Sequence, residues 1–416
     1  MGRRVVAWVS VLGALGVAAL PLGAQRAPAQ APVSLLNATL VNVRDGSLQR
    51  NMTVHLREGR IAALEAGAPA AAGATVFDLR GRHLLPGLID AHVHVANARA
   101  LRTALESGVT TVRSAGAQMW VDVGLREMVR QGLVIGPDVL ATGYHVRGGL
   151  GEDAFLVDPS LPAALFGAPP SVDVLRQVVR ANLAHGVDWI KTSGTERAGL
   201  PDTDPRKQVF TEAEIRAIVA EAATKQVPVM AHAHGAEGAL AAVKAGVRSI
   251  EHGTYLPDEA LDLMASQGTY FVPTIDIVHD LAEVGGDYDH RDLQLRGGHM
   301  LPRLRETILR AQARGVKIVT GADTGYGPAS VARVSTEILR LIDVGLTPLA
   351  ALQAATATAA EMLRLERQIG AVESGFEADL LVVERNPLEE PSTLRDPLLV
   401  ISNGRIGLDR LNFGRQ

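Results

Sequence analysis

The sequence predicts an α/β protein: a (β/α)8 TIM barrel that carries a small β-sandwich built from both chain ends. Between Gly87 and Leu365, eight strand-like segments alternate with helix-like segments over roughly 280 residues, which is typical of such a barrel. Short strands flank this region on both sides. An open doubly wound sheet is the alternative, but the first strand is not followed by a Gly-x-Gly-x-x-Gly turn.

The composition favours a compact enzyme. The chain has 416 residues, enough to bury a large core, with 21% charged and 4% aromatic residues. A formal net charge of −4 predicts no basic surface of the kind that nucleic acid requires. The chain contains no cysteine, which excludes disulfides and a lipid-modified N-terminal cysteine.

The first 24 residues predict a secretory signal peptide. Arg3 and Arg4 precede an apolar run from Val5 to Leu20, and Ala24 ends a small-residue cleavage motif. A membrane anchor is the alternative, but a span needs about 20 apolar residues and this run is shorter. We therefore expect an exported protein, periplasmic or secreted, with no stable membrane association after signal removal.

Both chain ends consist of short strands and turns. We expect residues 25–86 and 366–416 to pair into one β-sandwich, because neither part is long enough to form a core alone. In the second part, Ser402-Asn403-Gly404 predicts a hairpin turn. The expected strands are Leu35–Val43, Met52–Leu56, Arg60–Leu64, Asp379–Val383 and Leu398–Ile401.

Residues 87–365 form the predicted barrel. Its expected strands are Leu88–Val95, Thr110–Arg113, Asp138–Gly143, Asp188–Thr192, Pro228–His234, Ser249–Glu251, Tyr270–Pro273 and Lys317–Thr320. Its helical patterns include Val172–His185, Thr211–Lys225, Ala236–Ala245, Pro257–Ser266 and Leu304–Arg314.

Residues able to bind metal follow several of these strands, at the barrel face where active sites lie. Residues two apart on a strand share a face, so each His-x-His motif presents two imidazoles to one side. The candidates are His92, His94, Lys191, His232, His234, His252 and Asp323.

This set of side chains exceeds the needs of one tetrahedral zinc ion, which predicts a second divalent ion about 3.5–4 Å from the first. Two dications need an anionic bridge. Lys191 is the candidate, because neighbouring positive charge lowers a lysine pKa and a neutral amine can add carbon dioxide to form a bridging carbamate. The alternative for Lys191 is a structural salt bridge.

Six motifs together resemble the amidohydrolase superfamily, specifically its metal-dependent hydrolases related to imidazolonepropionase, Xaa-Pro dipeptidases and ochratoxin-hydrolysing amidases. The resemblance spans nearly the whole chain after the signal peptide, and a tail at residues 369–380 resembles the family's return to the β-sandwich. The motifs lie at residues 85–94 (LPGLIDAHVH), 108–113 (GVTTVR), 188–191 (DWIK), 231–235 (AHAHG), 250–253 (IEHG) and 321–323 (GAD).

The resemblance implies a role for each candidate. His92, His94 and Asp323 would bind the first metal ion. His232 and His252 would bind the second, and carboxylated Lys191 would bridge the two metal ions. The expected ions are Zn²⁺. His234 would form a hydrogen bond with the substrate or the developing oxyanion.

The expected reaction is hydrolysis of an amide C–N bond. A metal-bridging hydroxide attacks the scissile carbonyl, and Asp323 carries the proton to the leaving amine. The expected substrate is a small amide: a dipeptide, an N-acyl amino acid or an ochratoxin-like amide. Tyr144, His145 and Arg147, in a loop after a strand, are candidates for substrate binding, and the last two could bind a substrate carboxylate.

Three matters stay open from the sequence. The reaction alternatives are a cyclic-amide hydrolase, a mononuclear deaminase that would not need Lys191, and a non-catalytic secreted binding protein. The segments Tyr144–Ser171 and Ile275–Met300, which we expect to be long loops, could act as lids. The substrate side chain, the physiological metal and the existence of a homo-oligomer are likewise not determined.

Overall fold

A computed structural model describes residues 31–147, 150, 161, 171–328 and 330–411. The predicted signal peptide lies outside the described residues, as does most of the segment between Arg147 and Ser171. Within the described ranges, no helix is both long enough and apolar enough to cross a membrane.

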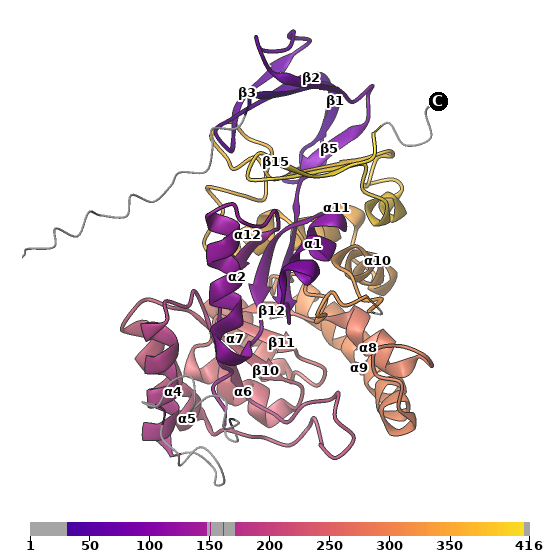
Figure 1. Ribbon diagram of the computed structural model, residues 1–416. Helices are drawn as coiled ribbons and strands as arrows, with labels where there is room; N and C mark the ends of the chain where they lie inside the picture. Colours follow the sequence, from indigo (N-terminus) through magenta and orange to yellow (C-terminus); the bar gives the residue numbers. More distant parts are fainter. Residues whose placement is uncertain (1–30, 148–149, 151–160, 162–170, 329, 412–416) are drawn as a thin grey trace, which may run out of the picture.

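The two chain ends pair into one mixed sheet, which lies at one end of the molecule (Figure 1). Its strand order is β15-β14-β13-β5-β1-β2-β3, with β4 paired to β1. The prediction that both ends share one β-structure is confirmed, and the pairing is that of a single continuous sheet. The strands are β1 (Val33–Val41), β2 (Leu48–Arg57), β3 (Arg60–Ala66), β4 (Thr75–Asp78), β5 (His83–Pro86), β13 (Leu380–Val383), β14 (Leu399–Ser402) and β15 (Arg405–Asp409).

The mixed sheet has its own core, formed by residues from both chain ends. Leu35 and Leu84 pack there with Leu380 and Leu399, and all four side chains are fully buried. The predicted hairpin turn joins β14 to β15, where Asn403 and Gly404 both have positive φ, as such a turn requires.

The chain passes from β5 directly into the other half of the molecule at Gly87. A side chain at this position would place its Cβ 2.2 Å from Thr110 Oγ1. Only glycine allows the two backbone segments to approach this closely. The Leu85-Pro86-Gly87 motif therefore forms the junction that leads into the first histidine-bearing strand.

Parallel strands form the second half of the molecule, in two sheets with the orders β6-β7-β8 and β12-β11-β10-β9. They are almost entirely buried, as expected for parallel strands covered by helices. The strands are β6 (Leu88–Val93), β7 (Val109–Ser114), β8 (Asp138–Leu140), β9 (Ile190–Ser193), β10 (Val229–Ala233), β11 (Ser249–His252) and β12 (Tyr270–Val272).

Single parallel bridges pair the two sheets with segments that lie outside the named strands. Val146 pairs with Thr192, Phe271 with Ile318 and Val93 with Thr324. The predicted eighth strand, Lys317–Thr320, is represented by the Ile318 bridge and is not a strand in the structure. The fold is thus an α/β arrangement of the TIM-barrel type, while the closed eight-stranded barrel stays a prediction.

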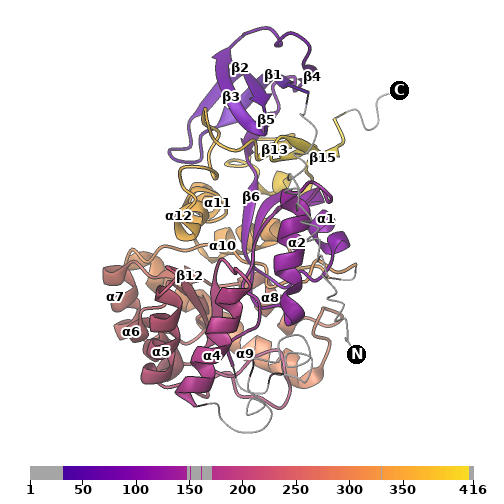
Figure 2. The same cartoon turned by 60° about the vertical axis from the view of Figure 1, so that its left-hand side comes forward.

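Helices cover the parallel strands, and α4 to α7 lie side by side along their outer face (Figure 2). Local sequence explains several boundaries; for example, Thr211 and Glu214 form a capping box at the start of α5. The helices are α1 (Ala98–Glu106), α2 (Val121–Arg130), α4 (Val172–Ala184), α5 (Glu212–Ala223), α6 (Ala236–Ala245), α7 (Asp258–Gln267), α8 (Ile275–Ala282), α9 (Arg291–Ala313), α10 (Val334–Val344), α11 (Pro348–Ala354) and α12 (Ala357–Leu363).

The segment Ile275–Met300 is largely helical, which corrects its description as a long loop. Helix α8 occupies its start, and α9 begins at Arg291 instead of near Leu304. Pro302 lies inside α9, where proline removes one backbone hydrogen bond and normally ends a helix. Packing of α9 against α8 outweighs this local preference.

Candidate active site

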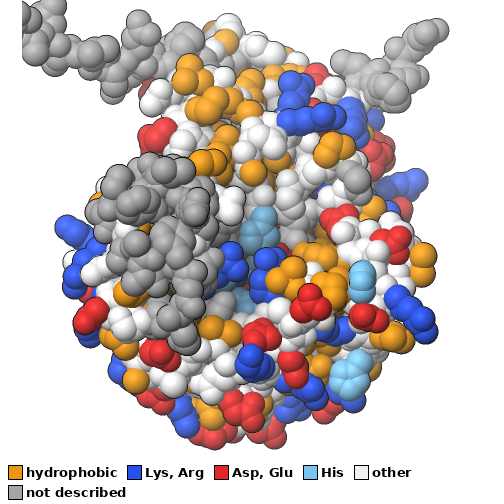
Figure 3. All heavy atoms as spheres, turned by 60° about the horizontal axis from the view of Figure 1, so that its bottom comes forward, with side chains coloured by type: hydrophobic (Ala, Val, Ile, Leu, Met, Phe, Trp, Pro, Cys, Tyr) orange, Lys and Arg blue, Asp and Glu red, His pale blue; other side chains and the backbone are white. Residues whose placement is uncertain are grey.

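The predicted metal-binding side chains converge at the carboxyl ends of the parallel strands. His92 comes from β6, Lys191 from β9, His232 from β10 and His252 from β11. The loops that follow contribute His94, His234 and Asp323. All of them line one cavity of about 200 Å³, and Figure 3 shows histidine side chains at the bottom of a hollow on this face of the molecule.

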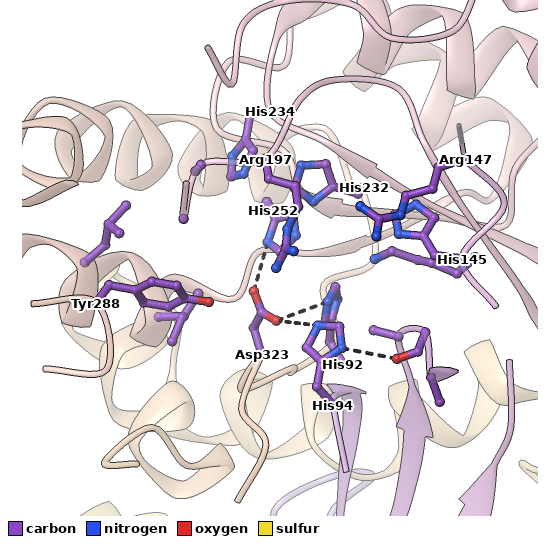
Figure 4. Close-up of a pocket in the computed structure, with 18 of the residues that line it drawn as sticks. His92, His94, His145, Arg147, Arg197, His232, His234, His252, Tyr288 and Asp323 are labelled. Carbon is purple, nitrogen blue, oxygen red and sulfur yellow. Dashed lines mark hydrogen bonds and ion pairs between the residues drawn. The ribbon is translucent and has the colours of Figure 1, made fainter. Parts of the chain in front are cut away.

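Asp323 lies at the centre of one group of ligands. Its Oδ1 atom is 3.1 Å from His94 Nε2 and 3.4 Å from His92 Nε2, and its Oδ2 atom is 3.9 Å from His252 Nδ1 (Figure 4). The backbone holds the residue in place, because its N–H donates to the His92 carbonyl and its φ is +47°. One carboxylate is thus positioned to share a cation with several imidazoles.

Three imidazoles, one of them shared with the first group, form a second group. His232, His234 and His252 offer ligand nitrogens that all lie within 4.8 Å of one another. The rings of His234 and His252 are stacked, with centroids 4.7 Å apart. His252 belongs to both groups, since its nitrogen also lies within 4.8 Å of His92 and Asp323 ligand atoms. The geometry therefore places two overlapping ligand sets side by side.

In each of the four buried histidines, one ring nitrogen contacts another protein group. The pairs are His92 Nδ1 with Glu251 Oε2 at 2.7 Å, His234 Nδ1 with Thr254 Oγ1 at 2.9 Å, His252 Nδ1 with Thr274 Oγ1 at 2.7 Å, and His232 Nε2 with the Glu196 carbonyl at 3.1 Å. Metal-binding histidines typically use one nitrogen in this way and offer the other to the ion.

Burial keeps these imidazoles in the form that binds metal. It lowers the pKa of His92 to about 4 and that of His234 to about 3, with a further contribution from Lys191. The pKa values of His232 and His252 also lie well below the usual value, mainly because of burial. Neutral imidazole is the ligand form, so the arrangement suits a cation.

Lys191 is only 2% exposed, and burial lowers its pKa to about 8 although Glu251 and Asp323 oppose the shift. No described carboxylate lies within 4.0 Å of the Lys191 amine, so the structure does not contain the salt bridge that was the alternative for this residue. A buried amine that loses its proton near pH 8 meets the chemical requirement for carbamate formation.

Behind His92 lies a buried ion pair that the sequence reasoning missed. Glu251 accepts two hydrogen bonds from Arg113 Nη2, at 2.9 and 3.0 Å, and both side chains are fully buried. Burial raises the pKa of Glu251, but Arg113 and His92 outweigh this effect and lower it to about 2. The available signal was one charged residue, Arg113 or Glu251, within each of two short strand-like segments.

The three loop residues that were predicted to bind substrate, Tyr144, His145 and Arg147, also line the cavity. His145 Nε2 lies 2.9 Å from Ser193 Oγ, and the Tyr144 ring packs edge-on against Trp120. Arg147 has a buried Nε atom without a hydrogen-bond partner among the described residues. Two further lining residues, Arg197 and Tyr288, were not identified from the sequence because they lie in irregular segments.

An apolar surface completes the cavity. Ile277, Val278 and Leu281 from α8 line it together with Tyr288. His279, Asp287 and His290, which the sequence places in the same segment, do not line it. The cavity thus combines an imidazole cluster, a cationic part and an apolar part.

Known proteins share this chain's sequence pattern and fold. The amidohydrolase family model matches residues 83–407. An ochratoxinase from Aspergillus niger is 28% identical over 422 residues, covering 89% of this chain and 85% of that protein. A solved Xaa-Pro dipeptidase with methionine in its active site has a TM-score of 0.77 at 28% identity, covering 90% of this chain and 99% of its own.

A putative prolidase from Bifidobacterium longum is also similar, with a TM-score of 0.80 at 30% identity over 91% of this chain and 95% of that one. These comparisons confirm the resemblance seen in the motifs. The chain belongs to the amidohydrolase family and is a hydrolase that acts on carbon–nitrogen bonds.

Proposed function

We propose that this protein is an exported, binuclear metal-dependent amidohydrolase that cleaves the amide bond of a dipeptide, an N-acyl amino acid or an ochratoxin-like amide. One observation carries the proposal. Six side chains of metal-binding type, from five separate segments, line a single cavity: His92, His94, Lys191, His232, His252 and Asp323.

The donor set fits two divalent ions, with Zn²⁺ the best match to imidazole and carboxylate ligands. His92, His94 and Asp323 would hold one ion, and His232 and His252 the other. Lys191, as N-carboxylysine, would bridge them. When bound, the two ions would activate a water molecule near neutral pH and polarise the scissile carbonyl.

The protein's own groups handle the proton and the developing charge. His92 and His94 keep the pKa of Asp323 below its usual range despite burial, so its carboxylate is ionised and can accept a proton. Asp323 then delivers this proton to the leaving amine. His234 donates a hydrogen bond to the carbonyl oxygen from Nε2 when the Thr254 hydroxyl donates to its Nδ1 atom.

The remaining assignments rest on the sequence. Residues 1–24 would direct export, residues 25–86 and 366–416 would form the β-sandwich, and residues 87–365 would close into the eight-stranded barrel.

The substrate class is supported by the cavity's combination of cationic and apolar walls. It is also supported by the activities for which two relatives are named, an ochratoxinase and an Xaa-Pro dipeptidase.

The test is hydrolysis by the purified, metal-loaded protein of a panel of dipeptides, N-acyl amino acids, cyclic amides and aminopurines. We expect turnover of members of the first two classes. Turnover confined to cyclic amides or aminopurines would instead assign the cyclic-amide hydrolase or deaminase reaction. Absence of turnover across the whole panel would overturn the proposal and favour a binding protein.

A further inference from the structure

Two arginine side chains enter the cavity from different loops. Arg147 follows β8, whereas Arg197 lies between β9 and α5. Figure 4 shows both near the imidazole cluster, with Arg147 beside His145 and on the opposite side of the cluster from Tyr288. The cavity therefore holds two guanidinium groups that are anchored independently.

Neither guanidinium is neutralised by the part of the protein that the structure describes. No carboxylate among residues 31–147, 171–328 and 330–411 lies within 4.0 Å of either group. Burial, together with the neighbouring charge of Arg197, lowers the pKa of Arg147. Arg147 is partly buried and Arg197 is exposed, and neither has a counter-ion among the described residues, so this side of the cavity attracts anionic groups of a ligand.

Geometry and chemistry limit what that ligand can be. A guanidinium binds one carboxylate through two parallel hydrogen bonds, so two guanidiniums on separate loops match two carboxylates. The α8 wall of Ile277, Val278 and Leu281 carries no charge and suits an apolar acyl group. The cavity thus distinguishes a dianionic end of the substrate from an apolar end.

We propose that the preferred leaving group is a dicarboxylic amino acid, glutamate or aspartate, with one carboxylate bound by Arg147 and the other by Arg197. The acyl side of the scissile amide then contacts the α8 wall. This inference rests on the proposed amidohydrolase function and specifies its substrate class.

The experiment compares hydrocinnamoyl-glutamate with hydrocinnamoyl-glutamine, which differ only in the second carboxylate. We expect kcat/KM to be at least about tenfold higher for the glutamate amide, as one charge-assisted hydrogen-bonded pair would give. Arg147→Gln and Arg197→Gln are then measured with both substrates. The variant that loses the partner of the side-chain carboxylate should bring the ratio of the two kcat/KM values close to one. The variant that loses the partner of the α-carboxylate, which both substrates carry, should lower both values together.

Arg206→Gln is the matched control. Arg206 lies in the same loop as Arg197 but pairs with Asp204 on the surface and does not line the cavity. The substitution removes the same charge, so the ratio should stay at its original value. A ratio near one in the unmodified enzyme, or an equal fall in the ratio with Arg206→Gln, would overturn the inference.

Binding to metal-free protein separates this inference from the proposed function. Free glutamate should bind at least about tenfold more tightly than glutamine by calorimetry, and Arg197→Gln should weaken glutamate binding. Equal affinities would overturn the inference even if amides are hydrolysed. A clear preference for glutamate without hydrolysis of any panel amide would support the dicarboxylate site and contradict the proposed reaction.

Discussion

Glu251 and Arg113 carry opposite charges at full burial, within hydrogen-bond distance of each other, and Glu251 also contacts His92. A buried pair of this kind adds little net stability compared with apolar residues, but removal of one partner leaves an uncompensated charge. Its location suggests why it is present: the carboxylate orients a predicted metal ligand. A change at Glu251 should therefore affect both stability and metal binding.

We predict that Glu251→Gln lowers the free energy of unfolding of the metal-free protein by about 3–5 kcal/mol, because Arg113 loses its buried counter-charge. Metal affinity should fall about 10- to 100-fold as His92 loses its carboxylate partner. Urea denaturation and a metal-competition assay measure the two effects. At the exposed Glu65, the same substitution should change stability by less than about 0.5 kcal/mol; a similarly small effect at Glu251 would contradict the account.

At this scale, the sequence identified residues that occur in strong local patterns. His92, His94, His232, His234 and His252 were visible because His-x-His and Glu-His-Gly motifs follow strands, and all of them line the cavity. Arg197 and Tyr288 have no such pattern. Their proximity to the imidazoles depends on how two loops fold over the strand ends, and local spacing does not encode this.

Helix α8 connects the cavity wall to a buried acidic pair. Glu337 of α10 accepts hydrogen bonds from the backbone N–H groups of Ile275 and Asp276, and thereby caps the start of α8. Burial raises the pKa of Asp276 to about 6 and holds that of Glu337 well above its usual value. The position of the apolar wall thus depends on carboxyl groups whose pKa values are raised.

We predict that the stability of the Asp276→Asn variant increases relative to that of the parent protein as pH rises. The pKa of Asp276 is higher in the folded state than its ordinary value of 3.8. Its contribution to stability is therefore complete below that value and is lost as pH rises through about 6. Between pH 4.5 and 8, the difference in unfolding free energy should shift by about 1–3 kcal/mol in favour of the variant.

Urea denaturation of both proteins at the two pH values measures this shift. Asp343→Asn, at an exposed position of α10, provides the same chemical change without burial. A difference between Asp276→Asn and the parent that is identical at both pH values would show that burial does not control this carboxyl group.

Element prediction succeeded where sequence period and capping agreed and failed where packing decided. The helix starting after Thr211 has a complete capping box and was predicted correctly. Helix α9 was predicted too short because Pro302 and two glycines, Gly297 and Gly298, weaken its local signal. Its helical state depends on contacts with α8, which lies adjacent only in the folded protein.

At the scale of the whole molecule, a single backbone junction links the mixed sheet to the parallel strands. Gly87 lies between β5 and β6, and Thr110 of β7 occupies the space where a side chain would project. The strand that brings His92 into the cavity therefore starts from a point shared by both halves. Its position is sensitive to any added atom.

We predict that Gly87→Ala destabilises the protein by at least about 1–3 kcal/mol, because its Cβ would lie 2.2 Å from Thr110 Oγ1. Gly124→Ala is the control. Gly124 lies in α2, and a methyl group added there would have no neighbouring atom within 4 Å, so alanine should stabilise by up to about 1 kcal/mol. Urea denaturation should show opposite signs; equal signs would contradict the proposed role of the junction.

Alternating strand and helix signals were enough to predict an α/β fold of the TIM-barrel type, and the two β-rich chain ends were enough to predict their pairing. The predicted eighth strand is not a strand in the structure. Lys317–Thr320 forms one bridge, between its Ile318 and Phe271, and the backbone then turns so that Asp323 faces the imidazoles. Strand pairing of so short a segment is determined by its neighbours and not by its own residues.

The proposed active site is binuclear and bridged by carboxylated Lys191. The most direct test is the metal content of the purified protein and of its Lys191→Ala variant, each assayed on the amide panel. We expect two divalent ions per chain in the parent protein, and loss of both bound metal and activity in the variant. One ion per chain, or an active Lys191→Ala variant, would contradict it.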